Sequence, residues 1–113
     1  MEPVEYRRAL GCFATGVTVV SVRGPDGAPV GITANSFNSV SMDPPLILFS
    51  LSRGSYSLQA FLESPTFAVN VLRDDQQTLS NRFAQAGSDK WANVGYDIWD
   101  TGCPILHDAL AKF

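Results

Sequence analysis

The sequence predicts a mainly β fold, an antiparallel barrel with short helices at its ends, formed by one domain over residues 1–113. An alternating, β-branched run at residues 15–22 is typical of a strand. Gly-Pro-Asp-Gly follows at residues 24–27, and this turn chemistry predicts that the next run returns antiparallel to the first. The later helical patterns are too short to be the crossovers that a parallel sheet requires.

The chain is expected to open with a helix and then a β-hairpin. Pro3 suits the first turn of a helix over residues 2–11, because proline lacks an N–H that this turn would leave unpaired. The run at 15–22 then pairs with a second strand at 29–34 through the turn at 24–27.

The middle of the chain mixes polar and apolar segments. Residues 35–43 are polar and rich in serine, which predicts an irregular crossing segment. The two prolines at 44–45 exclude a helix and lead into a buried strand at 46–51. Apolar residues at i, i+3 and i+4 from Leu58 predict one face of a short helix that opens at residues 54–55.

The last third is expected to hold one strand, one helix and a long loop. Residues 66–72 form the fourth strand. Asp74, with a glutamine three positions later, resembles a capping box and predicts a helix over 74–84. Residues 86–101 have a loop-like pattern, and residues 104–113 are expected to begin another strand.

Composition excludes several classes of function. Apolar residues make up 45% of the chain and charged residues 17%, so a core can form and a disordered charged tail is excluded. A net charge of −3 gives no electrostatic footprint for nucleic acid. The near-apolar run at 44–49 is far shorter than the ~20 residues of a membrane span. Cys12 and Cys103 form no metal motif, and we expect reduced thiols in a cytoplasmic protein.

Side chains that transfer protons are scarce, whereas hydroxyl and amide groups are abundant. His107 is the single histidine, and pairing it with Cys12 or Cys103 as a nucleophile is a weaker alternative to a packing role. Hydroxyl and amide residues gather at 33–41 and again at 50–57. Such groups suit a bound organic cofactor that supplies the chemistry itself. Arg53, followed by Gly-Ser, suits a phosphate, although Ser55 could equally be a helix cap.

Several ordered segments resemble the flavin reductases of two-component monooxygenases. The opening segment is ALGCFATGVTVV at residues 9–20. The central signature consists of GITANSF at 31–37 and SVSMDPPL at 39–46. The segments FAVNVL at 67–72 and LSNRFA at 79–84 continue it in the same order. The resemblance covers nearly the whole chain and implies an FMN-binding split barrel with Greek-key antiparallel strands.

The resemblance also implies which residues hold the flavin. The group that would line the isoalloxazine ring and ribityl side is Thr33, Ala34, Asn35 and Ser36, with Ser39 and Val40 nearby. The group that would hold the ribityl chain and phosphate is Ser50, Leu51, Ser52, Arg53, Ser55 and Ser57. Arg82, Phe83 and Lys90 belong to segments that would approach the flavin. No catalytic acid or base and no metal ligand is implied.

The implied function is an NAD(P)H:flavin oxidoreductase that passes a hydride from NADH or NADPH to FMN or FAD. The reduced flavin would serve a partner monooxygenase, and the reductase would be a homodimer. Two alternatives stay open: another split-barrel flavoenzyme, similar to pyridoxamine-phosphate oxidases, and a non-catalytic module that binds flavin or dimerises.

The chain is short for this family, and we expect it to be truncated at its C-terminus. The strands that close the barrel, and a Gly-Asp-His-type motif near the nicotinamide, would follow Phe113. Because an incomplete barrel leaves a sheet edge exposed, we expect stability to require a dimer, an exchange of segments or a longer protein.

Overall fold

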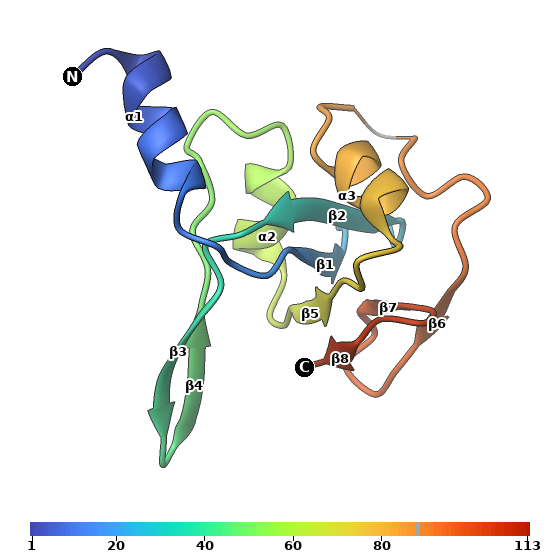
Figure 1. Cartoon of the computed structure of the whole chain (residues 1–113). Helices are drawn as coiled ribbons and strands as arrows, with labels where there is room; N and C mark the ends of the chain where they lie inside the picture. The colour runs from blue at the N-terminus through green and yellow to red at the C-terminus, as the bar shows by residue number, and fades with distance from the viewer. Residues whose placement is uncertain (88) are drawn as a thin grey trace.

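A four-stranded antiparallel sheet organises the chain, with strand order β2-β1-β5-β8. The structure, a computed structural model, describes residues 1–87 and 89–113. The strands of this sheet are β1 (Thr18–Arg23), β2 (Pro29–Ala34), β5 (Ala68–Val71) and β8 (Ala111–Lys112). Two further two-stranded sheets are not part of its hydrogen-bonded ladder: β3–β4 projects away from it, whereas β6–β7 packs beside it (Figure 1). The described strands therefore form a mainly β fold without closing into one continuous barrel.

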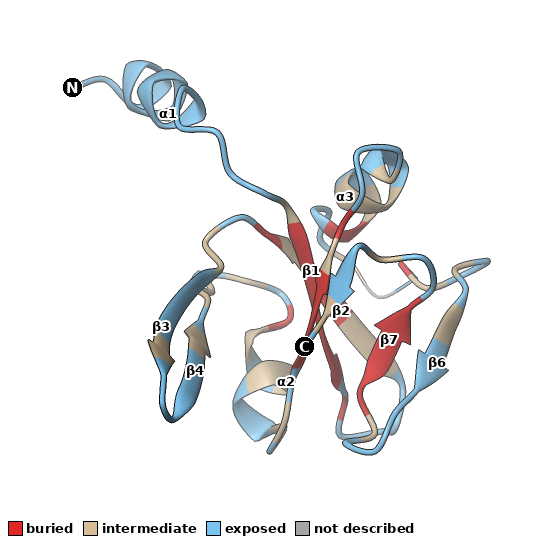
Figure 2. Cartoon of the chain, turned by 60° about the horizontal axis from the view of Figure 1, so that its bottom comes forward, coloured by how far each residue is buried: buried red, intermediate tan, exposed pale blue. Residues whose placement is uncertain are grey.

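The predicted β1–β2 hairpin is confirmed, and β1 is the centre of the core. Gly27 adopts φ +86°, which a turn at this position requires, and the Gly24 N–H donates to the Ala28 carbonyl at 2.8 Å. Because side chains alternate across a strand, Val19 and Val20 face opposite sides of the sheet. Val19 packs with Phe83 and Leu106, and Val20 packs in a separate cluster that includes Ile32 and Val69. Both faces of β1 are thus covered (Figure 2).

Two elements extend away from this core (Figures 1 and 2). Helix α1 (Pro3–Gly11) forms where the sequence predicts it, and none of its residues is buried. Strands β3 (Asn38–Met42) and β4 (Pro45–Leu48) pair as a projecting hairpin with a register shift between Ser39 and Ser41. The prediction of an irregular segment at 35–43 is therefore wrong for residues 38–42. The predicted strand at 46–51 does form, at 45–48, but it is largely exposed and not buried. A serine-rich strand is compatible with this position because both faces of the hairpin are largely exposed.

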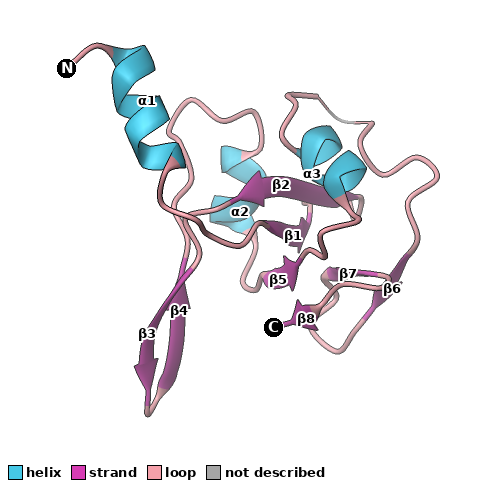
Figure 3. Cartoon of the chain, viewed as in Figure 1, coloured by secondary structure: helices cyan, strands magenta, loops and turns pink. Residues whose placement is uncertain are grey.

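The two remaining helices are shorter than predicted (Figure 3). Helix α2 (Leu58–Glu63) begins after residues 54–55, which lie in a turn. Helix α3 (Gln77–Phe83) begins after Asp74, and the predicted capping box does not form. Instead, the Gln76 side chain accepts a hydrogen bond from the Arg73 N–H at 2.8 Å through Oε1.

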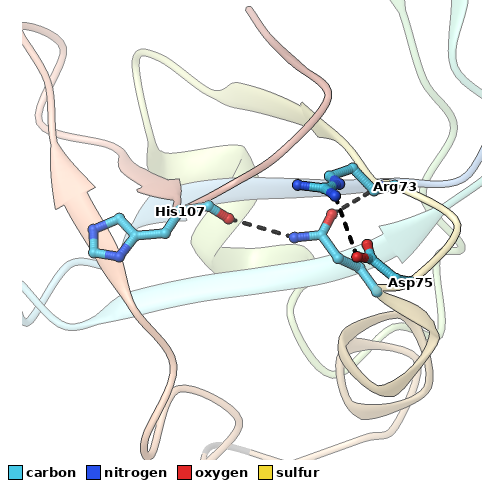
Figure 4. Close-up of polar contacts among 4 residues, drawn as sticks. Arg73, Asp75 and His107 are labelled. Carbon is cyan, nitrogen blue, oxygen red and sulfur yellow. Dashed lines mark hydrogen bonds and ion pairs between the residues drawn. The ribbon is translucent and has the colours of Figure 1, made fainter.

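The start of α3 is also linked to the C-terminal part of the chain (Figure 4). Gln76 donates from Nε2 to the carbonyl of His107 at 3.4 Å, and Arg73 pairs with Asp75 at 3.3 Å. Both members of that ion pair are exposed, so the pair contributes little stability.

The C-terminal third forms more regular structure than the sequence predicts. Strands β6 (Tyr96–Ile98) and β7 (Pro104–Leu106) pair antiparallel, and β6 lies within the segment predicted as a loop. The predicted strand beyond residue 104 is confirmed by β7 and by β8, which joins the edge of the main sheet. Within the described ranges, no helix is long and apolar enough to span a bilayer.

Candidate functional site

The two hydroxyl-rich segments of the sequence meet at one cleft, which we call the first cleft. It has a volume of about 700 Å³, within the range of small-molecule sites. The end of β2 and the following turn form one wall, and the segment between β4 and α2 forms another. Eleven predicted site residues line it: Thr33, Ala34, Asn35, Ser36, Ser50, Leu51, Ser52, Ser55, Ser57, Phe83 and Lys90.

Two of the predicted hydroxyls hold the walls of the first cleft together. Ser36 Oγ accepts a hydrogen bond from the Ser50 N–H at 2.8 Å and so joins the two segments. Thr33 Oγ1 donates to the Ser80 carbonyl at 2.5 Å and so fixes α3 against β2. A hydroxyl can both donate and accept, so each retains acceptor capacity beyond these bonds. Their first contribution is therefore to the shape of the cleft.

Lys90 supplies positive charge to the first cleft from a buried position. The residue is 8% exposed, and its Nζ donates to the carbonyls of Gly31 and Phe83, each at 3.2 Å. An ammonium has three N–H groups, so one donor remains after these two bonds. Burial lowers the pKa of Lys90 because it removes the ammonium from water, and no carboxylate of the described chain pairs with it to offset this. An anionic group beside Nζ would stabilise the charged form.

Close packing around Gly31 fixes the positions of Lys90 and of the adjacent Trp91. A Cβ at Gly31 would lie 2.9 Å from Trp91 Cζ2 and 3.0 Å from the Phe83 ring. The absence of a side chain lets both rings rest on β2. Phe83 and Trp91 stack edge to face, with centroids 4.8 Å apart. Lys90 is thereby held between α3 and β2.

Four predicted site residues lie outside the lining of the first cleft. Ser39 and Val40 lie on the projecting β3–β4 hairpin and are exposed, because that strand leaves the core after residue 37. Arg53 is exposed in the turn between the lining residues Ser52 and Gly54. Arg82 donates from Nη1 to the Ala92 carbonyl at 2.7 Å and so holds the loop after α3.

The structure adds lining residues that the sequence reasoning missed. They are mostly small or apolar and comprise Val17, Ile32, Gly54, Tyr56, Ser80, Ala84, Gln85 and Ala86. Gly54 and Tyr56 had a usable signal, since both lie inside the 50–57 cluster. The others lie outside the two hydroxyl-rich segments, and only the folded chain brings them to the cleft.

Comparison with known proteins identifies the family of this chain. The family model described as "Flavin reductase like domain" matches residues 10–113. The chain belongs to the flavin reductase family. FMN reductase (NADH) SmoA of Agrobacterium fabrum is 46% identical over 108 residues, which are 96% of this chain and 61% of that protein. The reductase component of the flavin-dependent trigonelline monooxygenase of Acinetobacter baylyi is 46% identical over 109 residues, 96% of this chain and 35% of that protein.

Solved structures support the same assignment for this flavin reductase chain. NADH:FAD oxidoreductase SgcE6 of Streptomyces globisporus C-1027, solved in complex with NAD and FAD fragments, superposes with a TM-score of 0.90. It is 39% identical, and the match covers 98% of this chain and 67% of that one. The chain spans about three fifths of the length of the Agrobacterium relative and about a third of the length of the Acinetobacter relative.

The first cleft fits a flavin by the chemistry of its walls. Ile32, Leu51 and Phe83 offer apolar contact for a flat ring, and the serines offer hydroxyl donors and acceptors for a polyol chain. The remaining Lys90 donor suits a phosphate. No carboxylate or imidazole is among the described residues that line this cleft, so nothing there repels an anionic ligand.

Proposed function

We propose that this chain is an NAD(P)H:flavin oxidoreductase that binds FMN or FAD in the first cleft. The observation that carries the proposal is the combination in one cleft of a hydroxyl-rich wall and a buried ammonium without a carboxylate partner. When bound, the flavin accepts a hydride from the nicotinamide, so the protein need not supply an acid or base. Its residues position the ring and exclude water.

We assign the two ends of the flavin from the distribution of apolar and polar groups. Residues 33–36 end β2 and would face the ring, where backbone N–H groups can donate to its polar edge. Ser52, Ser55 and Ser57 would contact the ribityl chain and phosphate, with Lys90 at the phosphate. Arg53 is exposed beside this group and would add a weaker, solvent-screened attraction.

The hydride donor is proposed to be NADH. This choice is supported by the names of two relatives, an FMN reductase (NADH) and an NADH:FAD oxidoreductase. The same names cover both flavins, so the family membership alone does not decide between FMN and FAD. NADPH is the alternative donor, and a comparison of the two donors with one flavin would separate them.

A monooxygenase partner and a homodimer complete the proposal. Relatives named as reductase components of flavin-dependent monooxygenases support the partner. The dimer is supported by apolar side chains on the two projecting elements. On α1 these include Tyr6 and Leu10, 57% and 56% exposed, and on the β3–β4 hairpin Val40 and Met42, 55% and 92% exposed. A second copy would remove these surfaces from water.

A cytoplasmic location is also part of the proposal. Cys12 is exposed and Cys103 is buried, and both are free thiols. Free thiols are typical of the reducing cytoplasm.

The proposal is tested by NADH oxidation with FMN or FAD as acceptor. The wild-type chain should consume NADH only when flavin is added. Ser36→Trp should abolish turnover and flavin binding, because its bulk fills the first cleft and breaks the bond to the Ser50 N–H. Thr78→Trp places the same bulk on the exposed part of α3 and should behave as the wild type.

Two results would contradict the proposal in different ways. Flavin binding without NADH oxidation by the wild type would identify a flavin-binding module instead of a reductase. Unchanged flavin affinity in Ser36→Trp, with the variant folded by circular dichroism, would show that the flavin binds elsewhere.

A further inference from the structure

Tyr56 is the exposed aromatic side chain of the first cleft. Among the described residues that line this cleft, two are aromatic, Phe83 and Tyr56. Phe83 is 1% exposed, whereas Tyr56 is 68% exposed. Phe83 therefore belongs to the packed interior, and Tyr56 stands at the rim of the cleft. A ring in this position holds apolar surface in water that contact with a bound ligand would bury.

The backbone around Tyr56 is held by hydrogen bonds, so a movement of its ring is a rotation of the side chain. Ser52 Oγ accepts from the Gly54 N–H at 3.2 Å, and Ser55 Oγ accepts from the Ser57 N–H at 3.3 Å. The Ser55 N–H also donates to the Ser52 carbonyl at 3.0 Å. These bonds fix both chain neighbours of Tyr56. Rotation about its χ1 torsion carries the ring between staggered positions about 120° apart.

Tyr56 borders a second hollow as well as the first cleft. This hollow has a volume of about 400 Å³, and Tyr56 is among the residues that line both cavities. The walls of the hollow include Pro25, Ala60 and Trp91, which offer apolar surface to an aromatic ring. The Tyr56 ring therefore has two places in which it can pack, one in the hollow and one over a ligand in the first cleft.

The neighbours of Tyr56 indicate which part of a flavin its ring would contact. Ser55 and Ser57 are the residues that we assign to the ribityl chain and phosphate, and residues 33–36, assigned to the isoalloxazine ring, form another wall of the cleft. A tyrosine ring over the ribityl chain packs against its C–H groups. In this position it leaves the face of the isoalloxazine ring free for a nicotinamide.

We propose that Tyr56 is a positioning residue that turns over the ribityl chain of a bound flavin and turns back toward the second hollow when the flavin leaves. The inference rests on the proposed function, because it requires a flavin in the first cleft. It goes further by naming the side chain that sets how fast the flavin is released. The apolar face of the ring carries the effect, and the phenol hydroxyl does not.

The test measures the dissociation constants and dissociation rates of three flavins by fluorescence with stopped-flow mixing on the full chain. FMN and riboflavin contain the ribityl chain, whereas lumiflavin lacks it. Tyr56→Ser should raise both quantities at least about fivefold for FMN and riboflavin and leave lumiflavin within about twofold of the wild type. Tyr56→Phe keeps the ring and should match the wild type with all three flavins. Trp99→Ser removes an aromatic side chain that is 50% exposed and lies outside both cavities, and should change neither quantity.

A second variant tests the alternative position of the ring. Ala60→Phe adds bulk to the wall of the second hollow. With the hollow filled, the Tyr56 ring stays over the first cleft, so the association of FMN should slow several-fold. Adding Tyr56→Ser to this variant should remove the slowing, because the two changes act on one movement.

The contrary results overturn the inference. Equal losses for lumiflavin and riboflavin in Tyr56→Ser would show a general effect on the cleft, and a loss in Tyr56→Phe as large as in Tyr56→Ser would assign the effect to the hydroxyl. Unchanged FMN association in Ala60→Phe would refute the movement of the ring. A wild-type chain that binds no flavin would refute the proposed function itself, whereas flavin binding that does not respond to Tyr56→Ser would refute only the role of Tyr56.

Discussion

Asn70 ties three strands together from a fully buried position, and its replacement by alanine should strongly destabilise the fold. Its Nδ2 donates to the Val19 carbonyl at 2.9 Å and to Ser21 Oγ at 3.2 Å. Its Oδ1 accepts from the Leu106 N–H at 2.9 Å. Ser21 Oγ in turn donates to the Pro104 carbonyl at 2.6 Å. This network is what attaches β7 to the main sheet through polar contacts.

The magnitude follows from the bonds that Asn70→Ala removes. Three hydrogen bonds at a net ~1 kcal/mol each give about 3 kcal/mol. The Leu106 N–H and the Val19 carbonyl lose their side-chain partner in a buried setting, which raises the expected loss to about 3–5 kcal/mol. That is a large part of the ~5–15 kcal/mol free energy of unfolding of a typical domain.

The assay is urea unfolding followed by circular dichroism, with Asn81→Ala as the matched control. Asn81 is exposed on α3, so its loss should change the free energy of unfolding by less than ~0.5 kcal/mol. Should Asn70→Ala prove too unstable to fold, Ser21→Ala, which removes two bonds of the same network, should still cost about 1–3 kcal/mol. A loss below 1 kcal/mol in both variants would refute the reasoning.

Three further predictions concern binding and assembly. Arg53→Ala should weaken FMN binding only two- to fivefold, about 0.5–1 kcal/mol, because the side chain is exposed. Fluorescence titrations should show unchanged riboflavin binding, and equal losses for both ligands would indicate a folding role. Between the lowered pKa of Lys90 and the ordinary pKa of a lysine, the ratio of FMN affinity to riboflavin affinity should fall as pH rises. In this range Lys90 is neutral in the free protein and must take up a proton to pair with the phosphate of FMN. Lys90→Met should abolish this pH dependence, and its persistence would remove Lys90 from the phosphate site. Val40→Glu should shift the chain toward monomer in light scattering, whereas an unchanged mass would exclude the β3–β4 hairpin from the interface.

The sequence predicted the parts of the fold that local chemistry determines. The β1–β2 hairpin follows from β-branched alternation and the glycine turn, and β2 has the predicted bounds of 29–34. The sequence-based prediction failed for β3, because this serine-rich strand has no buried face and so shows no alternation of apolar and polar residues. The capping box failed because α3 begins at Gln77 with Gln76 as its N-cap, so Asp74 lies before the cap position. Strand β6 was missed because it is short and largely exposed.

Local chemistry of the sequence marked the site only where residues adjacent in sequence share a wall, whereas Phe83 and Lys90 were assigned through the family resemblance. The group at 33–36 and the lining members of 50–57 meet at the first cleft as expected. Ser39 and Val40 were assigned through the family resemblance, yet they lie on the exposed strand β3, outside the lining of the first cleft. The burial of Lys90 depends on packing of α3 against β2, and no local pattern in the sequence encodes that contact.

A crystal structure of the chain with FMN tests the central claim most directly. The account predicts the isoalloxazine ring against residues 33–36 and the phosphate at Ser57 and Lys90, with Nζ donating to a phosphate oxygen. FMN bound outside the first cleft, or bound there with its phosphate far from Lys90, would contradict the account.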